Sequence, residues 1–150
     1  MKEEPDTSVE LRARALRLLA RREHSRAELE RKLAPHSESS DALKNLISDL
    51  KTRNQLSEER FAEERARSLS RKFGAARIRH DLKAKGVSEE LVARFSSSSD
   101  ELQNAKAILE RKYRTPALTR EERARRMRFL QSRGFSSETI YKLLSARDRG

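Results

Sequence analysis

Apolar residues along this chain recur at helical spacing, in short runs that end at sharp corners. The clearest run lies within residues 73–95, where Ile78 and Leu82 stand four positions apart and therefore share one face of a helix. Gly86 follows where that helix must end, because glycine adopts the left-handed backbone conformation without a steric penalty. Ser88 is then a preferred N-cap residue for the next helix. The pattern predicts two short helices joined by a tight turn.

The same arrangement returns elsewhere in the chain. Residues 130–136 (Leu-Gln-Ser-Arg-Gly-Phe-Ser) match residues 82–88 (Leu-Lys-Ala-Lys-Gly-Val-Ser) in role at nearly every position. A weaker copy lies at 29–50, where Pro35 and His36 stand in place of the glycine corner. Such self-similarity is typical of tandem modules that bury apolar faces on their neighbours. Because no segment alternates apolar and polar residues with period two, the sequence predicts an all-α protein of nine helices in three triplets.

Boundary signals divide the chain into a flexible tail at 1–8 and three-helix repeats at 9–55, 56–99 and 100–150. The four serines at 96–99 are the clearest linker. The fourth helix is predicted to keep Phe73 on its apolar face and to end at Gly74, and the third to end near Asn54. Capping residues are expected at Asp6, Thr7 or Ser8 for the first helix, Ser25 with Glu28 for the second, Ser57 for the fourth and Thr119 with Glu122 for the eighth.

Composition narrows the classes of function. Only 35% of the residues are apolar and 39% are charged, so several thin cores are expected in place of one large core. The formal net charge of +11 favours a polyanion or an acidic protein as partner. The chain has no cysteine, no long apolar run and no apolar signal segment near Met1, which leads us to expect a cytoplasmic protein.

Nothing in the sequence predicts an enzyme. Carboxylates occur as adjacent pairs such as Glu58 with Glu59, which point about 100° apart on a helix and do not converge on one substrate. The three histidines, His24, His36 and His80, are isolated, so surface or capping roles are expected and no metal site is predicted. The glycines at helix ends form no phosphate-binding loop. We therefore expect no catalytic residue, metal or cofactor.

The basic residues are the candidates for partner contacts. They gather in two stretches, and the second has no acid between residues 123 and 133, so its arginines lack local ion-pair partners. These stretches predict a surface that faces phosphates or carboxylates. The few aromatic residues occupy expected core or capping positions, which argues against base stacking. The candidates for contact with a partner protein or DNA are Arg71, Lys72, Arg77, Arg79, Lys83, Lys85, Arg123, Arg125, Arg126, Arg128 and Arg133.

Three segments together resemble the RecX family of regulatory proteins. Residues 16–33 resemble its opening signature, residues 56–62 with 74–87 its central signature, and residues 129–136 its last. The three occur in order and at family spacing, over about residues 10–146. Two departures are Ser57-Glu58-Glu59, where the family has an Asp-rich turn, and the Pro35-His36 corner of the first repeat.

The resemblance implies a fold of three tandem three-helix repeats in an elongated, curved stack. It also implies binding to RecA and to the filament that RecA forms on single-stranded DNA. That binding would inhibit the recombinase, ATPase and co-protease activities of RecA, and so affect recombination, DNA repair and the SOS response. We expect a monomer, because nothing in the sequence suggests an obligate dimer.

An alternative is a non-specific DNA-binding protein built from helix-turn-helix-like modules. Against sequence-specific readout, the last helix of each repeat opens with acidic or neutral residues, as at 88–90 and 136–138. A helical scaffold for another acidic protein is a third reading of the same charge. The sequence leaves open whether basic residues meet protein or DNA.

Overall fold

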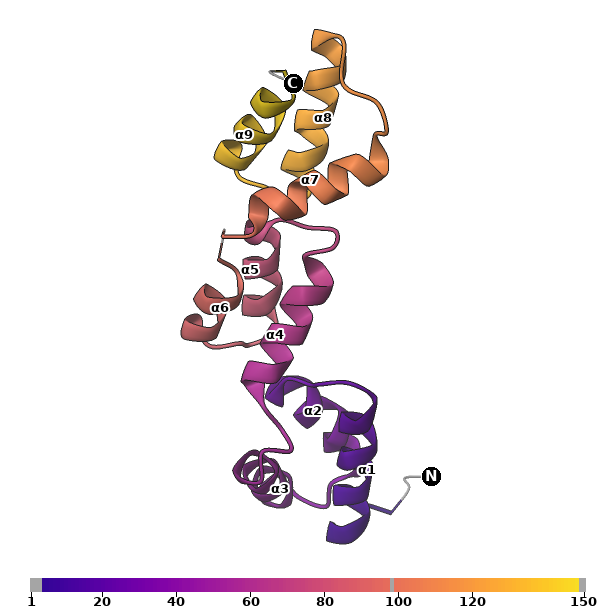
Figure 1. Cartoon of the computed structure of the whole chain (residues 1–150). Helices are drawn as coiled ribbons and strands as arrows, with labels where there is room; N and C mark the ends of the chain where they lie inside the picture. The colour runs from indigo at the N-terminus through magenta and orange to yellow at the C-terminus, as the bar shows by residue number, and fades with distance from the viewer. Residues whose placement is uncertain (1–3, 98, 149–150) are drawn as a thin grey trace. The chain divides into compact units, whose positions relative to one another are not determined.

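The computed structural model describes residues 4–97 and 99–148, and all regular structure in that part of the chain is helical (Figure 1). This confirms the prediction of an all-α fold with nine α-helices in the described residues. A single 3₁₀ turn, Ala34–His36, follows the second helix. The α-helices are α1 Ser8–Arg21, α2 Arg26–Leu33, α3 Ser40–Thr52, α4 Glu58–Leu69, α5 Ala75–Ala84, α6 Glu89–Phe95, α7 Glu101–Lys112, α8 Arg120–Ser132 and α9 Ser137–Asp148.

The capping predictions are largely confirmed. Thr7 caps α1 by accepting a hydrogen bond from the Glu10 amide at 3.2 Å, and Thr119 with Glu122 forms a complete capping box at α8. Ser25 caps α2 and accepts from the Glu28 amide at 3.1 Å. The second half of that expected box is missing, because the Glu28 carboxylate binds Arg22 instead of reaching back to Ser25.

Contacts within the chain define two compact units. The first comprises Met1–Glu64 with Lys85–Val87, and the second Arg65–Ala84 with Ser88–Gly150. The boundary passes through α4, so the predicted repeat limits at 55/56 and 99/100 stay predictions. Parts of the predicted tail, the serine linker and the last repeat lie outside the described residues, at 1–3, 98 and 149–150.

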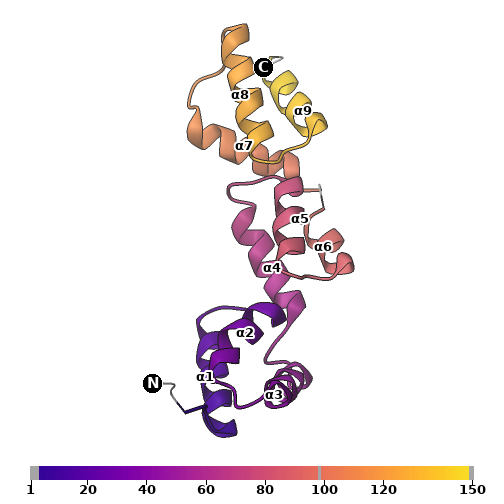
Figure 2. The ribbon, with the colours of Figure 1, turned by 180° about the vertical axis from the view of Figure 1, so that it is seen from behind.

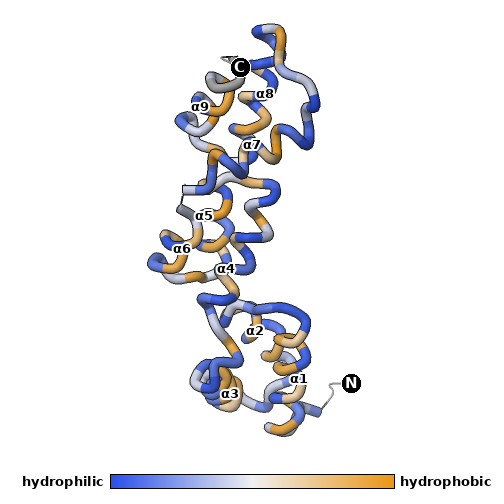
Figure 3. Tube along the Cα trace, in the orientation of Figure 1, coloured by the Kyte–Doolittle hydropathy of each residue, from blue (hydrophilic) through white to orange (hydrophobic). Residues whose placement is uncertain are grey.

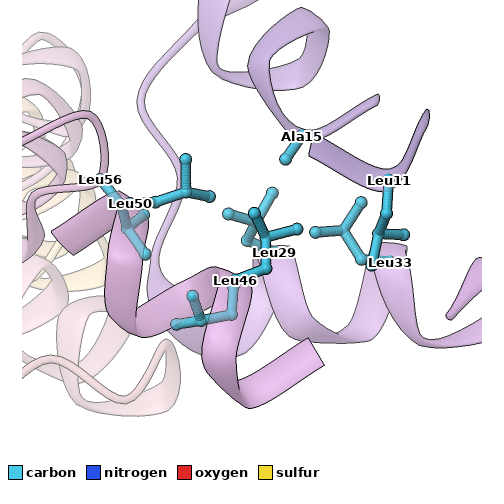
Figure 4. Close-up of a cluster of buried hydrophobic side chains, with 8 residues drawn as sticks. Leu11, Ala15, Leu29, Leu33, Leu46, Leu50 and Leu56 are labelled. Carbon is cyan, nitrogen blue, oxygen red and sulfur yellow. The ribbon is translucent and has the colours of Figure 1, made fainter. Parts of the chain in front are cut away.

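The first unit is held by a core from α1, α2 and α3 (Figure 4). The leucines of these helices point into one cluster, and Leu29, Leu33 and Leu50 have no exposed surface. Burying a side chain of this size contributes about 1.5–3 kcal/mol. In Figure 3, hydrophobic positions recur along each helix between hydrophilic ones, and the hydrophobic face of each helix supplies the cluster. The buried members are Leu11, Ala15, Leu29, Leu33, Leu46, Ile47, Leu50 and Leu56.

The second unit contains a corresponding core made by α7, α8 and α9, which lie together in both views (Figures 1 and 2). Leu109 and Leu130 are fully buried there. Phe135, which follows the glycine corner, is also buried, as its position in the motif predicts. The buried members are Ala105, Ile108, Leu109, Leu130, Phe135, Ile140, Leu143 and Leu144.

Three local expectations were wrong. Helix α4 ends at Leu69, not beside Phe73, because the chain turns at residues 70–72 and the Phe73 amide donates back to the Leu69 carbonyl at 2.8 Å. Gly74 therefore precedes α5 and does not end α4. His24, expected at the surface or at a cap, is 1% exposed, so the surface expectation fails, whereas its ring does bind the carbonyl of Arg22, the C-cap residue of α1. The first two differences bring Phe73 and Gly74 to the start of α5.

Candidate functional site

Two glycines bring the start of α5 against the corner between α8 and α9. The Gly74 amide donates to the Arg133 carbonyl at 2.8 Å, and the Ala76 amide donates to the Gly134 carbonyl at 3.3 Å. A Cβ on Gly74 would lie 2.6 Å from the Gly134 oxygen, and a Cβ on Gly134 would lie 2.7 Å from the Arg77 Cβ. Only glycine permits this approach, and Gly134 also needs its left-handed φ of 87°. The contact fixes Arg77 relative to Arg133.

Cations and aromatic rings alternate beside this contact, all within the second unit. Arg77 and Arg133 both lie on the Phe73 ring, with Cζ 4.7 Å and 5.6 Å from its centroid. Arg133 also lies 5.1 Å from the Phe129 centroid, and the Lys112 ammonium lies 4.2 Å from that centroid. We call the whole series the cation–aromatic strip; in spatial order its members are Arg77, Phe73, Arg133, Phe129, Lys112, Tyr113 and Arg126.

The rings hold the cations in place. Phe129 and Tyr113 pack edge to face, with centroids 6.1 Å apart and an interplanar angle of 82°, a favoured geometry for aromatic pairs. Each cation–ring contact contributes about 0.5–1 kcal/mol at an exposed site. The ring of Phe73 is covered by two guanidinium groups, so it is not a free platform for stacking a nucleic-acid base. The strip therefore presents positive charge to the solvent and not aromatic surface.

No acid neutralises the strip from within. In the part of the chain that the structure describes, its four cations make no ion pair with a carboxylate, whereas cations elsewhere, such as Arg60 with Glu23, do. Arg77 and Lys112 are exposed and Arg133 is half-buried. Arg77 and Arg133 share one ring and so lie within about 10 Å of each other, one Debye length at 0.1 M salt. Such unpaired like charges repel one another until an anion binds.

Arg126 lies inside the third repeat, 5% exposed. Its Nη2 donates to the Thr115 carbonyl at 2.7 Å, its Cζ lies 4.5 Å from the Tyr113 centroid, and its buried Nη1 has no hydrogen-bond partner. The sequence expectation of a surface contact here presupposed an exposed side chain, and that assumption was wrong. The physical reason is that Arg126 holds the connection between α7 and α8 from within.

The other candidates lie in different surroundings. The structure brings Arg77 and Arg133 together in the strip of the second unit, whereas Lys85 is half-buried in the first unit. Arg123, Arg125 and Arg128 are exposed on α8. The exposed candidates on or just before α5 are Arg71, Lys72, Arg77, Arg79 and Lys83.

Lys112 is a strip residue that the sequence analysis missed. It stands in the last turn of α7, where a cation is favoured by the helix dipole and attracts no further attention. The available signal was its place directly before Tyr113, in a stretch with Arg111 and Arg114 and no acid. Arg111 also reaches the turn between α4 and α5, where it donates to the Arg71 carbonyl.

A separate polar cluster lies in the first unit. Arg22 binds the Glu28 carboxylate with two hydrogen bonds, of 2.9 Å and 2.8 Å, and this pairing lowers the pKa of Glu28 to about 2. Burial lowers the pKa of His24. Its Nδ1 donates to the Arg22 carbonyl at 3.0 Å and its Nε2 accepts from Lys32 at 3.1 Å, which fits a neutral ring. This cluster connects the α1–α2 turn to α2, which is a structural role.

Neither a metal-binding cluster nor a membrane-spanning helix occurs in the described part of the chain. Residues 4–97 and 99–148 contain no group of three or more acidic or histidine side chains that could hold a metal ion. In the same ranges, no helix is long and apolar enough to cross a membrane.

Comparisons with known proteins identify relatives over nearly the whole chain. Three family models match it, described as the first, second and third three-helix domains of RecX, over residues 12–41, 57–94 and 99–144. A regulatory protein RecX from Ralstonia nicotianae is 38% identical over 146 residues, covering 96% of this chain and 92% of that protein. One from Neisseria gonorrhoeae is 41% identical over 135 residues, covering 89% and 88%.

Solved structures agree on the fold. The crystal structure of RecX from Lactobacillus salivarius matches with a TM-score of 0.78 at 18% identity, covering 95% of this chain and 97% of that one. A second crystal structure, of regulatory protein RecX, matches with a TM-score of 0.69, also at 18% identity, covering 93% and 75%.

Proposed function

The chain belongs to the RecX family of regulatory proteins, and from this premise we propose that it acts on RecA. In the proposal it binds RecA filaments on single-stranded DNA in the cytoplasm and lowers their recombinase, ATPase and co-protease activities. It does so as a binding protein without catalytic chemistry of its own. The sequence resemblance suggested this partner, and the formal net charge of +11 supports an anionic target.

One observation carries the proposal to particular residues. Arg125 and Arg128 are exposed, three positions apart on α8, within a stretch of the sequence that contains no acid from 123 to 133. Residues three apart share a helix face, so their charges can meet one acidic surface together. Complementary charge at an interface mainly raises the association rate and excludes wrong partners. We assign this face of α8 to contact with RecA protein.

The test is ATP hydrolysis by RecA on single-stranded DNA, titrated with this protein well below one molecule per RecA protomer. We expect hydrolysis to fall with the wild-type chain. We expect the double variant Arg125→Glu/Arg128→Glu to need about tenfold more protein for the same effect, or about 1.4 kcal/mol of binding free energy. Arg126 is left unchanged because its burial would confound binding with folding.

A matched control carries the same change of charge elsewhere. Lys44 and Lys51 are exposed on α3 in the first unit, so Lys44→Glu/Lys51→Glu lowers the net charge equally. This control should inhibit like the wild type. Equal inhibition by the α8 variant would remove α8 from the proposal, and no inhibition by the wild type would overturn the proposed function.

A further inference from the structure

We propose that the cation–aromatic strip binds the phosphate backbone of nucleic acid directly, through Arg77, Arg133 and Lys112. This inference rests on the proposed function only for the source of the nucleic acid, which would be the DNA within the filament. The strip would contact phosphate, whereas Arg125 and Arg128, which are not part of the strip, would contact RecA protein as in the proposed function.

The cations of the strip are preorganised. Arg133 is held between two rings, with Cζ 5.6 Å from the Phe73 centroid and 5.1 Å from the Phe129 centroid. The Arg77 backbone is fixed by the glycine contact, since the Gly134 carbonyl accepts the amide of its neighbour Ala76. A guanidinium group held in one orientation loses less conformational entropy when its N–H groups bind an anion. The arrangement suits repeated anionic groups that carry several acceptor oxygens.

The composition of the strip suits nucleic-acid phosphate better than an acidic protein surface. Stable protein interfaces have an apolar centre from which charged residues are depleted, whereas nucleic-acid interfaces are polar and strongly positive. The large apolar side chains that are exposed in the second unit, Leu102, Leu118, Met127 and Tyr141, do not belong to the strip. The strip has unpaired cations and half-buried, covered rings. It therefore lacks the apolar area that a protein partner would bury.

The aromatic rings of the strip are covered by cations, which bears on how bases could be recognised. Bases are bound without sequence preference by stacking on open aromatic faces, and with preference by side chains that reach their edges. Here Phe73 lies beneath two guanidinium groups, and Lys112 lies 4.2 Å from the Phe129 centroid. The rings support the cations and do not receive bases. Binding should therefore depend on phosphate and salt and be independent of sequence.

The experiment measures binding of the whole chain to a fluorescent single-stranded oligonucleotide by fluorescence anisotropy, without RecA, at salt concentrations from about 0.05 to about 0.3 M. Each phosphate contact on a single strand contributes about 0.7 to the slope of log K against log salt, so the slope over this range counts the contacts. The variant Arg77→Gln/Lys112→Gln/Arg133→Gln should lower that slope by about 2 and weaken binding about 100-fold at 0.1 M salt. A duplex of the same length tests the source of the phosphates. If the variant loses affinity equally for the single strand and the duplex, the strip contacts backbone phosphates common to both. If it loses affinity for the single strand alone, the strip contacts single-stranded DNA.

Two further variants keep the result interpretable. Arg77→Gln/Lys112→Gln changes only exposed side chains, should fold normally, and should lower the slope by about 1.4. The matched control Lys106→Gln/Arg114→Gln/Arg120→Gln removes three exposed charges of the same unit outside the strip, and should change the slope by less than about 0.7.

Two outcomes would overturn the inference. One is a strip variant that binds DNA like the wild type, including one that binds DNA normally but no longer inhibits RecA, because the strip would then contact protein. The other is a control variant that loses as much affinity as the strip variant, because net charge alone would then explain binding. Since RecA is absent from the binding assay, failure of this inference is distinguishable from failure of the proposed function.

Discussion

Three glycine-to-alanine substitutions test whether the contact between α5 and the α8–α9 corner is as close as described. Gly86 and Gly134 occupy the same place in their repeats and have nearly equal φ values, 81° and 87°. Their surroundings differ. A Cβ on Gly86 would meet only the Ala27 Cβ at 3.9 Å, whereas a Cβ on Gly134 would lie 2.7 Å from the Arg77 Cβ and 2.9 Å from its backbone nitrogen. Gly86 is therefore a matched control for crowding.

The expected losses of unfolding free energy follow from these geometries. Forcing alanine into the left-handed region costs about 1 kcal/mol, and this is the whole cost expected at Gly86. Crowding by an inserted methyl group in a packed site costs about 2 kcal/mol more, so Gly134→Ala should lose about 3 kcal/mol. Gly74 has no positive φ, but its Cβ would lie 2.6 Å from the Gly134 oxygen. Gly74→Ala should therefore lose about 2 kcal/mol from crowding alone.

Urea unfolding followed by far-UV circular dichroism measures the total loss, and amide hydrogen exchange measures the contact itself. The Gly74 and Ala76 amides donate to the Arg133 and Gly134 carbonyls, so in Gly134→Ala these two amides should lose protection first. In Gly86→Ala they should keep it. An equal loss of stability in Gly134→Ala and Gly86→Ala, with both amides still protected, would refute the close contact.

Two further predictions concern buried charge. The pKa of Glu28 is about 2 in the folded chain, against an ordinary value of 4.5. The ionised carboxylate therefore stabilises the fold above pH 4.5, and this contribution is lost as pH falls from 4.5 towards 2. We expect the ion pair with Arg22 to stabilise the fold by about 2 kcal/mol at pH 7, a value reduced because the Arg22 side chain is 44% exposed and solvent screens the interaction. The difference in unfolding free energy between wild type and Glu28→Gln should shrink by that amount at low pH, and a difference constant with pH would contradict this. Arg126→Leu should leave stability unchanged or raise it by about 1 kcal/mol in thermal unfolding, because a buried cation without a carboxylate costs desolvation energy. A loss above about 2 kcal/mol would show that its contacts to Tyr113 and Thr115 outweigh that cost.

The helical architecture could be predicted because it is encoded locally. The spacing of Ile78 and Leu82 and the glycine at 86 determine a helix and its end without reference to the rest of the chain. Caps act within three residues, so Ser25 was predicted and Thr7 was among the three candidates for the first helix. What failed depended on distant contacts. Helix α4 ends before Phe73, which lies instead under Arg77 and Arg133, and no local pattern announces that contact.

The basic surface was only partly predictable, for the same reason. The acid-free run from 123 to 133 indicated a basic surface with arginines such as Arg125 and Arg128, but it could not separate these exposed side chains from the buried Arg126. The cation–aromatic strip joins three stretches, at 73–77, 112–113 and 126–133, through contacts made only in the folded chain. Sequence proximity therefore grouped Arg133 with its neighbours on α8, whereas the fold groups it with Arg77 and Lys112.

Comparison of the repeats explains why Arg126 is buried. When the corner motifs are aligned in sequence, so that Leu82 corresponds to Leu130, Arg126 stands at the position of Ile78 in the second repeat, and both are buried. A charged side chain at an apolar core position is costly unless other groups hold it, and here the Tyr113 ring and the Thr115 carbonyl do so. The same ring lies 5.8 Å from Lys112, so the group that holds the buried charge also supports an exposed one. The third repeat thus replaces an apolar core contact with a support for the charged strip; the shared motif marks position 126 as a core position, whereas the contacts that hold the arginine there are made only in the folded chain.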